Sequence, residues 1–277
     1  MKTIIFVLTL LISAGKMMGQ ELYVYSEPAS NMPAKSIATK MTGHFVTSNY
    51  EYDRWSQRYM PEVMFGVNRN LMLHISSTFA NMHTRNFRFE SVSVYGKYRF
   101  LSKDEIHKHF RMAVFADASY TRSDFHFDEI SLMGDKSGIE AGLIATQLWH
   151  KFALSATVSH TQVLDKSRND DVLYIPGRNY QSMNYILSGG YLLLPREYND
   201  YKQLNINIYT EFIAQHTFEE KKYYVDMAPA LQFIFNSNAK LNIGYRFQLG
   251  SDMSRMAKNS WLVSLERTFL SALKKKK

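Results

Sequence analysis

The stretch Leu241-Asn242-Ile243-Gly244-Tyr245-Arg246-Phe247-Gln248-Leu249-Gly250 decides the fold. Its odd-numbered positions are apolar, and its even-numbered positions are polar or glycine. This two-residue period is typical of a β-strand that has one apolar face and one polar face. About ten residues is also the length that a tilted strand needs to cross a bilayer. The stretch therefore predicts a membrane-spanning strand with one face toward lipid and the other toward water or a polar lumen.

Runs with the same alternation follow one another along the chain from residue 36. The last run places Trp261, Val263, Leu265 and Phe269 on one face, and it resembles the terminal strand that the barrel-assembly machinery recognises. The runs predict twelve strands. These are 36–46, 57–67, 71–80, 89–100, 109–121, 138–149, 152–163, 181–194, 204–214, 225–235, 241–249 and 260–269.

The segments between the predicted strands differ systematically in length. Residues 68–70, 150–151 and 236–239 are short and turn-like, whereas 101–108 and 195–202 are longer polar turns on the same side. The other side carries 47–56, 81–88, 122–137, 164–180, 215–222 and 250–259. Short periplasmic turns, long extracellular loops and an even strand number are typical of outer-membrane barrels. We therefore expect an all-β protein, a single antiparallel transmembrane β-barrel over residues 36–270.

The chain begins with a predicted signal peptide, residues 1–19. Lys2 precedes an apolar run from Ile4 to Ala14, which is too short to span a bilayer as a helix. The chain has no cysteine, so neither a lipid anchor nor a disulfide is expected. We expect export through a cleaved signal peptide to the cell outer membrane, where the barrel contacts lipid.

The net charge of +8 comes from the ends of the chain. Six of the 33 basic residues lie in the signal peptide or in the tail Lys274–Lys277, which leaves 27 basic against 25 acidic residues. A nearly neutral body argues against nucleic acid as a partner. Residues 271–277 are expected to form a solvated basic tail.

A soluble β-barrel or sandwich would alternate in the same way. The signal peptide, the even strand number and the asymmetry of the loops favour the membrane barrel. Aromatic residues near the predicted strand ends fit an interfacial girdle, since such rings prefer the membrane–water boundary. They are Tyr98, Phe100, Tyr120, Trp149, Tyr191 and Trp261.

Several stretches resemble a family of Bacteroidota outer-membrane β-barrel proteins. They are Glu21–Phe45, His109–Tyr120, Gly138–Ala156 and Ala228–Phe247. The resemblance covers nearly the whole mature chain and implies an outer-membrane barrel. The family has no established catalytic or ligand residues to transfer to this sequence.

Charged side chains fall on the predicted inward face of many strands. Pairing or hydration must compensate them, because an unpaired charge inside a barrel costs several kcal/mol. They could form a structural ion-pair network or line a hydrated path for small polar solutes. The set is Lys40, Arg58, Glu62, Lys97, Arg99, Arg111, Asp117, Glu140, Glu211, Asp226, Arg246 and Glu266.

The segment before the first strand, residues 20–35, is not strand-like. Pro28 and Pro33 favour an extended path. Residues 21–35 could enter the barrel as a plug, contact a periplasmic partner or simply lead into the first strand.

Two motifs test for chemistry beyond transport. His126, Asp128 and Glu129 in a predicted loop could bind a metal, but they lack the spacing of a strong metal motif. His74 and Ser76 have the spacing of an outer-membrane lipase pair, yet the predicted register turns both inward. We therefore expect no enzyme and no cofactor. The leading hypothesis is a small channel or transport component; the alternatives are a structural or partner-binding barrel and, less favoured, a lipid hydrolase.

Overall fold

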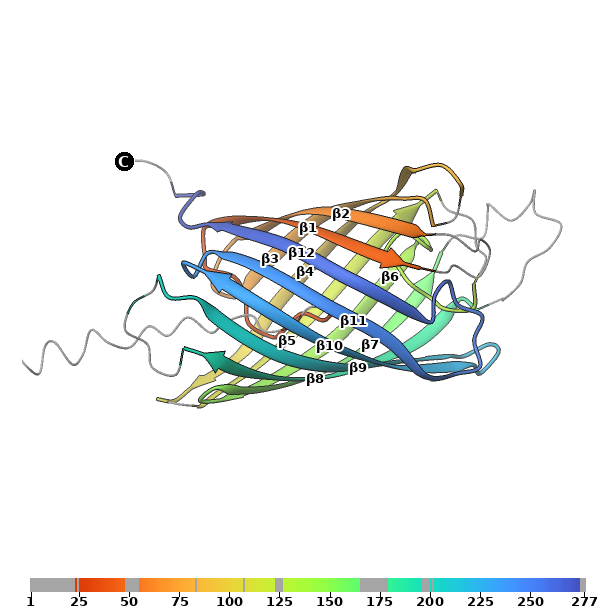
Figure 1. Cartoon of the computed structure of the whole chain (residues 1–277). Coiled ribbons are helices and arrows are strands. Elements are labelled where there is room, and N and C mark those ends of the chain that lie inside the picture. The colour runs from red at the N-terminus through yellow and green to blue at the C-terminus, as the bar shows by residue number, and fades with distance from the viewer. Residues whose placement is uncertain are drawn as a thin grey trace, which may run out of the picture.

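The protein forms one closed barrel of twelve antiparallel strands in which each strand pairs with its chain neighbours and β1 pairs with β12 (Figure 1). The computed structural model describes residues 23, 25–47, 55–82, 84–106, 108–122, 127–164, 179–195, 200 and 202–274. The predicted signal peptide and the tail beyond Lys274 lie outside these residues. The strands are β1 Ser36–Val46, β2 Ser56–Gly66, β3 Leu71–Ala80, β4 Arg88–Asp104, β5 Lys108–Thr121, β6 Gly138–Trp149, β7 Phe152–Val163, β8 Gln181–Leu194, β9 Asn205–Thr217, β10 Tyr223–Phe235, β11 Ala239–Ser251 and β12 Asn259–Phe269.

The predicted fold class and strand number are confirmed, and several strand ends differ, most of all at two places. The sequence placed a long polar turn at 101–108, but β4 continues to Asp104 and β5 begins at Lys108. Polar side chains extend this hairpin, because Asp104 Oδ1 accepts hydrogen bonds from Arg111 at 3.0 Å and contacts His109 Nδ1 at 2.9 Å. The predicted loop 215–222 is also shorter, since β9 runs to Thr217.

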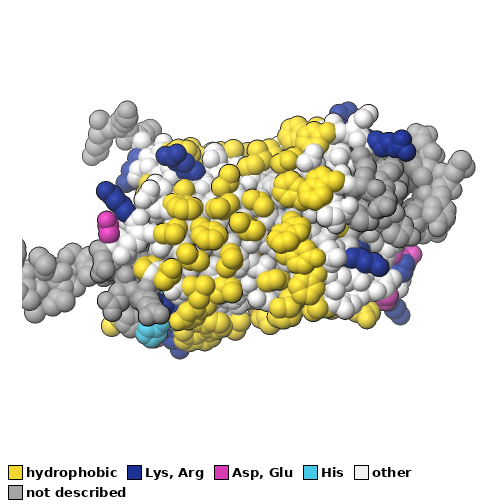
Figure 2. All heavy atoms as spheres, viewed as in Figure 1, with side chains coloured by type: hydrophobic (Ala, Val, Ile, Leu, Met, Phe, Trp, Pro, Cys, Tyr) yellow, Lys and Arg dark blue, Asp and Glu magenta, His cyan; other side chains and the backbone are white. Residues whose placement is uncertain are grey.

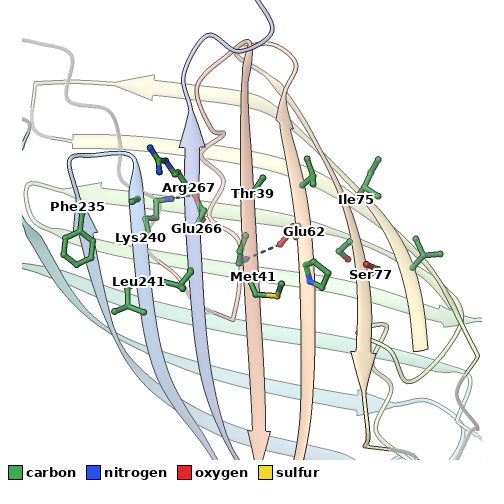
Figure 3. Close-up of a pocket in the computed structure, with 17 residues that line it drawn as sticks. Thr39, Met41, Glu62, Ile75, Ser77, Phe235, Lys240, Leu241, Glu266 and Arg267 are labelled. Carbon is green, nitrogen blue, oxygen red and sulfur yellow. Dashed lines mark hydrogen bonds and ion pairs between the residues drawn. The ribbon is translucent and has the colours of Figure 1, made fainter. Parts of the chain in front are cut away.

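The first and last strands close the barrel through a row of alternating charges. Lys40 on β1 lies opposite Glu266 on β12 and opposite Glu62 on β2. Figure 3 shows Glu62 and the pair Lys240–Glu266 in this row. The Nζ–carboxylate distances are 3.5 Å for Lys40–Glu62 and 3.0 Å for Lys240–Glu266. The row, Lys240–Glu266–Lys40–Glu62, therefore crosses the seam where the two ends of the sheet meet.

β1 begins and β12 ends at the same end of the barrel, because Ile37 pairs with Phe269. We call this end the terminal rim and the opposite end the loop rim.

The outer surface carries an apolar belt. In Figure 2, hydrophobic side chains cover the middle of the visible face, and Lys, Arg, Asp and Glu appear only toward its two ends. All six residues of the predicted aromatic girdle lie on this surface, from Trp149 at 39% exposed to Tyr120 at 55%. Exposed apolar side chains over the middle of a barrel fit contact with lipid. No helix in the described ranges is long and apolar enough to span a membrane.

The interior is polar instead of forming one apolar core. A row of hydrogen bonds crosses four strands from Asn207 through Gln232 and Asn242 to Ser264, with distances of 3.2, 2.8 and 2.8 Å. Buried apolar residues form small separate clusters, such as Ala29 with Ala113 and Ile144. Polar groups away from bulk water must be satisfied by such partners. The two-residue period of the sequence therefore separates side chains that face lipid from side chains that face the lumen.

Candidate functional site

Residues 25–35, the plug segment, lie inside the barrel near the terminal rim. Lys97 on β4 is fully buried, and its Nζ donates to Glu27 Oε2 at 3.0 Å and to the carbonyl oxygens of Pro28 and Ser30 at 2.7 and 2.9 Å. An ammonium group has three protons, and each of these acceptors takes one. Lys97 therefore fixes both a side chain and the backbone of the segment.

Other strands hold the same segment. Glu211 on β9 accepts hydrogen bonds from the backbone N–H groups of Tyr25 and Ser26 at 2.8 and 3.0 Å. The N–H of Ala29 donates to Thr146 Oγ1 on β6 at 2.9 Å. Because these contacts come from different sides of the barrel, the segment crosses the lumen. Of the three possibilities left by the sequence, the plug matches this placement.

Glu27 is charged in this environment. Burial raises the pKa of the Glu27 carboxyl. The ammonium of Lys97, with smaller contributions from His74 and Lys40, lowers this pKa by a larger amount, so that it falls to about 2. The contact with Lys97 is therefore a true ion pair at neutral pH, and charge-assisted hydrogen bonds of this kind are stronger than neutral ones.

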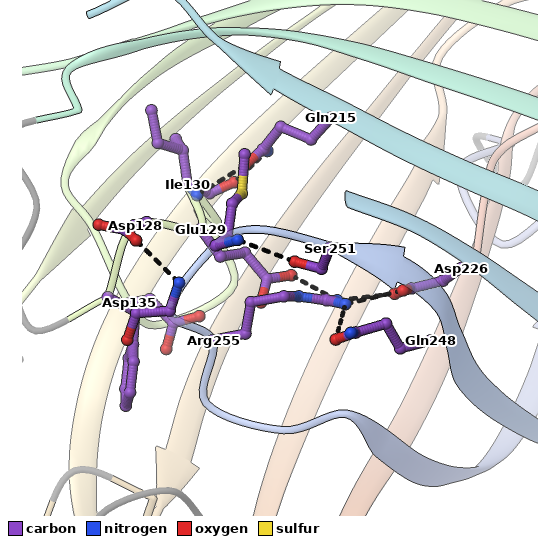
Figure 4. Close-up of polar contacts among 12 residues, drawn as sticks. Asp128, Glu129, Ile130, Asp135, Gln215, Asp226, Gln248, Ser251 and Arg255 are labelled. Carbon is purple, nitrogen blue, oxygen red and sulfur yellow. Dashed lines mark hydrogen bonds and ion pairs between the residues drawn. The ribbon is translucent and has the colours of Figure 1, made fainter. Parts of the chain in front are cut away.

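Residues 127–137, the inward loop, fold into the barrel at the loop rim. Ile130 exchanges two hydrogen bonds with the side-chain amide of Gln215, at 2.8 and 2.7 Å (Figure 4). Asp135 binds Arg58 on β2 at 2.5 Å. Lys136 Nζ donates to the carbonyl oxygen of Phe127 at 2.7 Å. The sequence placed this segment outside, as an extracellular loop; its polar groups instead bind inward side chains.

Two arginines and two carboxylates fasten the inward loop to the wall. Asp226 on β10, 1% exposed, binds Arg255 at 2.6 Å and Arg246 at 2.5 Å. Glu129 of the inward loop binds the same two guanidinium groups, at 3.1 and 3.4 Å. The guanidinium carbon of Arg255 also lies 3.9 Å from the centre of the Tyr224 ring. We call Glu129, Asp226, Arg246 and Arg255 the rim network.

The twelve charged residues predicted for the lumen all occupy inward positions of their strands. Within this set, Lys40 pairs with Glu62 and Arg246 with Asp226. Most others take partners that the sequence did not predict, in inserts, in turns or at strand ends. These contacts are Arg58–Asp135, Lys97–Glu27, Arg111–Asp104, Glu266–Lys240, Arg99 with the Arg69 carbonyl, and Glu211 with the plug backbone.

Asp117 and Glu140 lie directly opposite each other on β5 and β6. Neither forms an ion pair within the described residues.

The predicted lipase pair does not assemble. His74 Nδ1 contacts Glu62 Oε1 at 2.6 Å, and Ser76 Oγ lies 2.6 Å from Ser93 Oγ. Both side chains face the lumen, whereas a lipase site needs its pair at the membrane edge.

The residues proposed for a metal site have other partners. Asp128 Oδ2 accepts from Lys222 Nζ and from the N–H of Ser254, both at 2.8 Å, and Glu129 belongs to the rim network. His126 lies outside the described residues. No cluster of three or more His, Asp or Glu suited to a metal ion occurs in the part of the chain that the structure describes.

The outer wall has a depression of about 810 Å³ near the terminal rim, lined by Met41, Val63 and Leu265 among others (Figure 3). Pro61 lies within it, and the ladder between β2 and β3 is interrupted there, since pairing stops at Tyr59 and resumes at Glu62. Proline has no N–H to donate to a ladder. Its lining also includes Lys40, Glu62, Lys240 and Glu266, so the depression adjoins the charge row across the seam.

Docking of the inward loop should strengthen as the pH rises above about 7. Burial lowers the pKa of Lys136 to about 7, although Asp135 and Asp128 raise it in part. A solvated lysine has a pKa near 10.4. Between about pH 7 and pH 10.4 the docked loop binds fewer protons than the undocked loop. Raising the pH in this range therefore increases the equilibrium constant for docking by up to about tenfold per pH unit.

This pH dependence can be measured with a single cysteine, since the chain has none. Thiol labelling of Ile130→Cys, a position 4% exposed, should slow between pH 7 and 9 relative to Met133→Cys, a position 52% exposed. Adding Lys136→Met to both variants should remove the pH dependence of the ratio between the two labelling rates. A ratio that keeps its pH dependence without Lys136 would contradict the assignment.

Solved structures resemble this arrangement. An outer membrane channel from Pseudomonas putida F1 superposes with a TM-score of 0.57 at 13% identity, covering 89% of this chain and all of that one. The fold is that of an outer-membrane β-barrel. The KdgM porin and the β domain of the Bordetella autotransporter Brka each give a TM-score of 0.49, at 11% and 10% identity; each match covers 84% of this chain, and 99% and 98% of theirs. No family model and no curated protein matches the sequence.

Proposed function

We propose that this outer-membrane barrel is a small channel for small polar solutes or ions, and that the plug segment and the inward loop close it from its two ends. One observation carries this proposal: ion pairs and hydrogen bonds hold both inserts to the wall, beside small apolar contacts such as those of Ala29 and Phe127. The three hydrogen bonds from Lys97 to the plug segment and the rim network are examples. Polar contacts can be exchanged for water at modest net cost, whereas a plug with an apolar core would leave exposed apolar surface behind.

The orientation follows from the strand number. In even-stranded barrels of this kind both chain ends lie in the periplasm. The plug segment would then enter from the periplasm and the inward loop from the cell exterior. Release of the plug would also free residues 21–35 to contact a periplasmic partner. Export by a cleaved signal peptide, recognition of β12 by the assembly machinery and kinship with Bacteroidota barrels belong to the same proposal.

Single-channel recording in planar bilayers tests the channel. The refolded protein should give small, infrequent conductance steps, which become larger or more frequent when residues 25–33 of the plug segment are deleted. The deletion leaves Lys35, whose N–H donates to Gly66 at the start of the wall. A deletion variant that folds but gives no steps at any voltage or salt concentration would favour the alternative, a structural or partner-binding barrel.

A further inference from the structure

A belt of inward side chains lies between the two inserts. On β5, Asp117 falls between Arg111, which donates to Ser30 of the plug segment, and Thr121, whose N–H donates to Ser137 Oγ of the inward loop. On β6, Glu140 falls between Ser137 and Thr146 in the same way. We call Tyr95, Phe115, Asp117 and Glu140, with His74 and Ser119 beside them, the central belt.

Two carboxylates in the central belt lack a cationic partner. Asp117 and Glu140 are direct cross-strand neighbours on the inward face, and no Lys, Arg or His forms an ion pair with either within the described ranges. Glu140 accepts hydrogen bonds from Ser159 Oγ at 2.5 Å and from Asn184 Nδ2 at 3.3 Å. Like charges directly opposite each other are destabilising, and an uncompensated buried charge more so. This pair therefore requires a proton or a cation.

Buried polar atoms around the two carboxylates also lack partners in the described part of the protein. They include His74 Nε2, in a residue 4% exposed, and Ser119 Oγ, in a residue 8% exposed. Since His74 Nδ1 is held by Glu62, Nε2 lies on the other side of the ring. Ser119 is two positions from Asp117 and shares its inward face. Buried polar atoms are nearly always satisfied, so these atoms indicate a polar occupant.

The same belt has an aromatic side. Tyr95 lies opposite both His74 and Asp117, and its ring stacks on Phe115 with centroids 5.5 Å apart. Tyr95, Phe115, Asp117 and Glu140 are only partly buried although they point inward.

We propose that the central belt binds a small organic ammonium ion with an apolar group. The ammonium group would donate to Asp117 and Glu140, and the apolar part would lie against Tyr95 and Phe115. Charge-assisted hydrogen bonds and cation–π attraction favour such a ligand over a neutral one of the same shape. The stacked rings favour an organic cation over a bare metal ion. This inference names a solute class for the proposed channel. It rests on the proposed function only because the central belt lies between the plug segment and the inward loop, which would close the channel.

Calorimetric titration of the full-length protein in detergent tests the site. Benzylammonium should bind, whereas benzyl alcohol and benzoate should not. Asp117→Asn and Glu140→Gln should each weaken benzylammonium binding at least tenfold. The matched control Glu266→Gln, which removes an inward carboxylate that has a lysine partner, should leave binding unchanged. Heat-modifiable migration of each variant on gels verifies that the barrel is folded.

The titrations are repeated with Lys97→Met, so that a closed lumen does not hide the site. Absence of benzylammonium binding in both proteins would overturn the inference, as would equal binding of benzyl alcohol or an affinity unaffected by Asp117→Asn. Binding needs no conductance, so the two proposals fail separately. A barrel that binds but never conducts contradicts the channel, and one that conducts without binding contradicts the ammonium site.

Discussion

Replacing Lys97 with methionine is expected to release the plug segment and to raise thiol labelling of a cysteine at position 29 by at least about 100-fold. Lys97 provides three hydrogen bonds to the segment, and its removal leaves the Glu27 carboxylate without its nearest cation. Breaking a buried ion pair from one side costs about 3–5 kcal/mol. A cost of about 3 kcal/mol corresponds to roughly two powers of ten in an equilibrium constant.

The measurement uses Ala29→Cys, because Ala29 is fully buried and the replacement is small. Lys240→Met is the matched control: it neutralises another inward lysine, which pairs with Glu266 away from the plug segment. Labelling should stay slow in this control. The double variant Glu27→Gln with Lys97→Met should be less open than Lys97→Met alone, because it removes the orphaned charge. Equal labelling in all variants would show that Lys97 does not hold the plug.

Replacing Asp226 with asparagine is expected to release the inward loop and to lower the stability of the barrel by about 3–5 kcal/mol. Asp226 is 1% exposed and balances two guanidinium groups together with Glu129. Without its charge, Arg246 and Arg255 share the one carboxylate of Glu129. Because Glu129 belongs to the inward loop, repulsion between Arg246 and Arg255 should disturb the loop directly.

Two readouts separate these effects. Labelling of Ile130→Cys reports undocking of the loop, and the temperature at which the folded band disappears on gels reports stability. Asp252→Asn is the control, since Asp252 lies in the same loop as Arg255 but accepts a hydrogen bond from the N–H of Tyr223 outside the rim network. If Asp226→Asn behaves like Asp252→Asn in both readouts, the rim network does not fasten the loop.

The strands were predictable from the sequence because lipid and lumen impose a two-residue period on each of them. β6, β7 and β8 begin and end where the alternation predicts. Inward positions such as Lys97 and Glu211 follow from the same period. Their partners do not, because Glu27 is 70 residues from Lys97 and alternation contains no information about which insert fills a lumen.

The inward loop shows the same limit of sequence reasoning. Asp128, Glu129 and Asp135 look like ordinary polar loop residues, and the sequence assigned them to solvent or to a metal site. In the structure they bind Lys222, Arg255 and Arg58. The nearest available signal was an excess of acidic residues in 127–137 matched by inward arginines on distant strands. Pairing them requires knowing that the loop folds back into the barrel.

The charge row across the seam has a consequence for how the barrel assembles. A slip of two residues between β1 and β12 would keep every apolar side chain toward lipid, so hydrophobicity alone does not distinguish the slipped closure from the native one. Such a slip would place Lys40 opposite Ser264 or Thr268 instead of Glu266. Unpaired charges of Lys40 and Glu266 on the inner face of the wall would then oppose closure of the barrel. Several closures place the same apolar side chains toward lipid. Among them, Lys40 and Glu266 select the one with the native circumference and tilt.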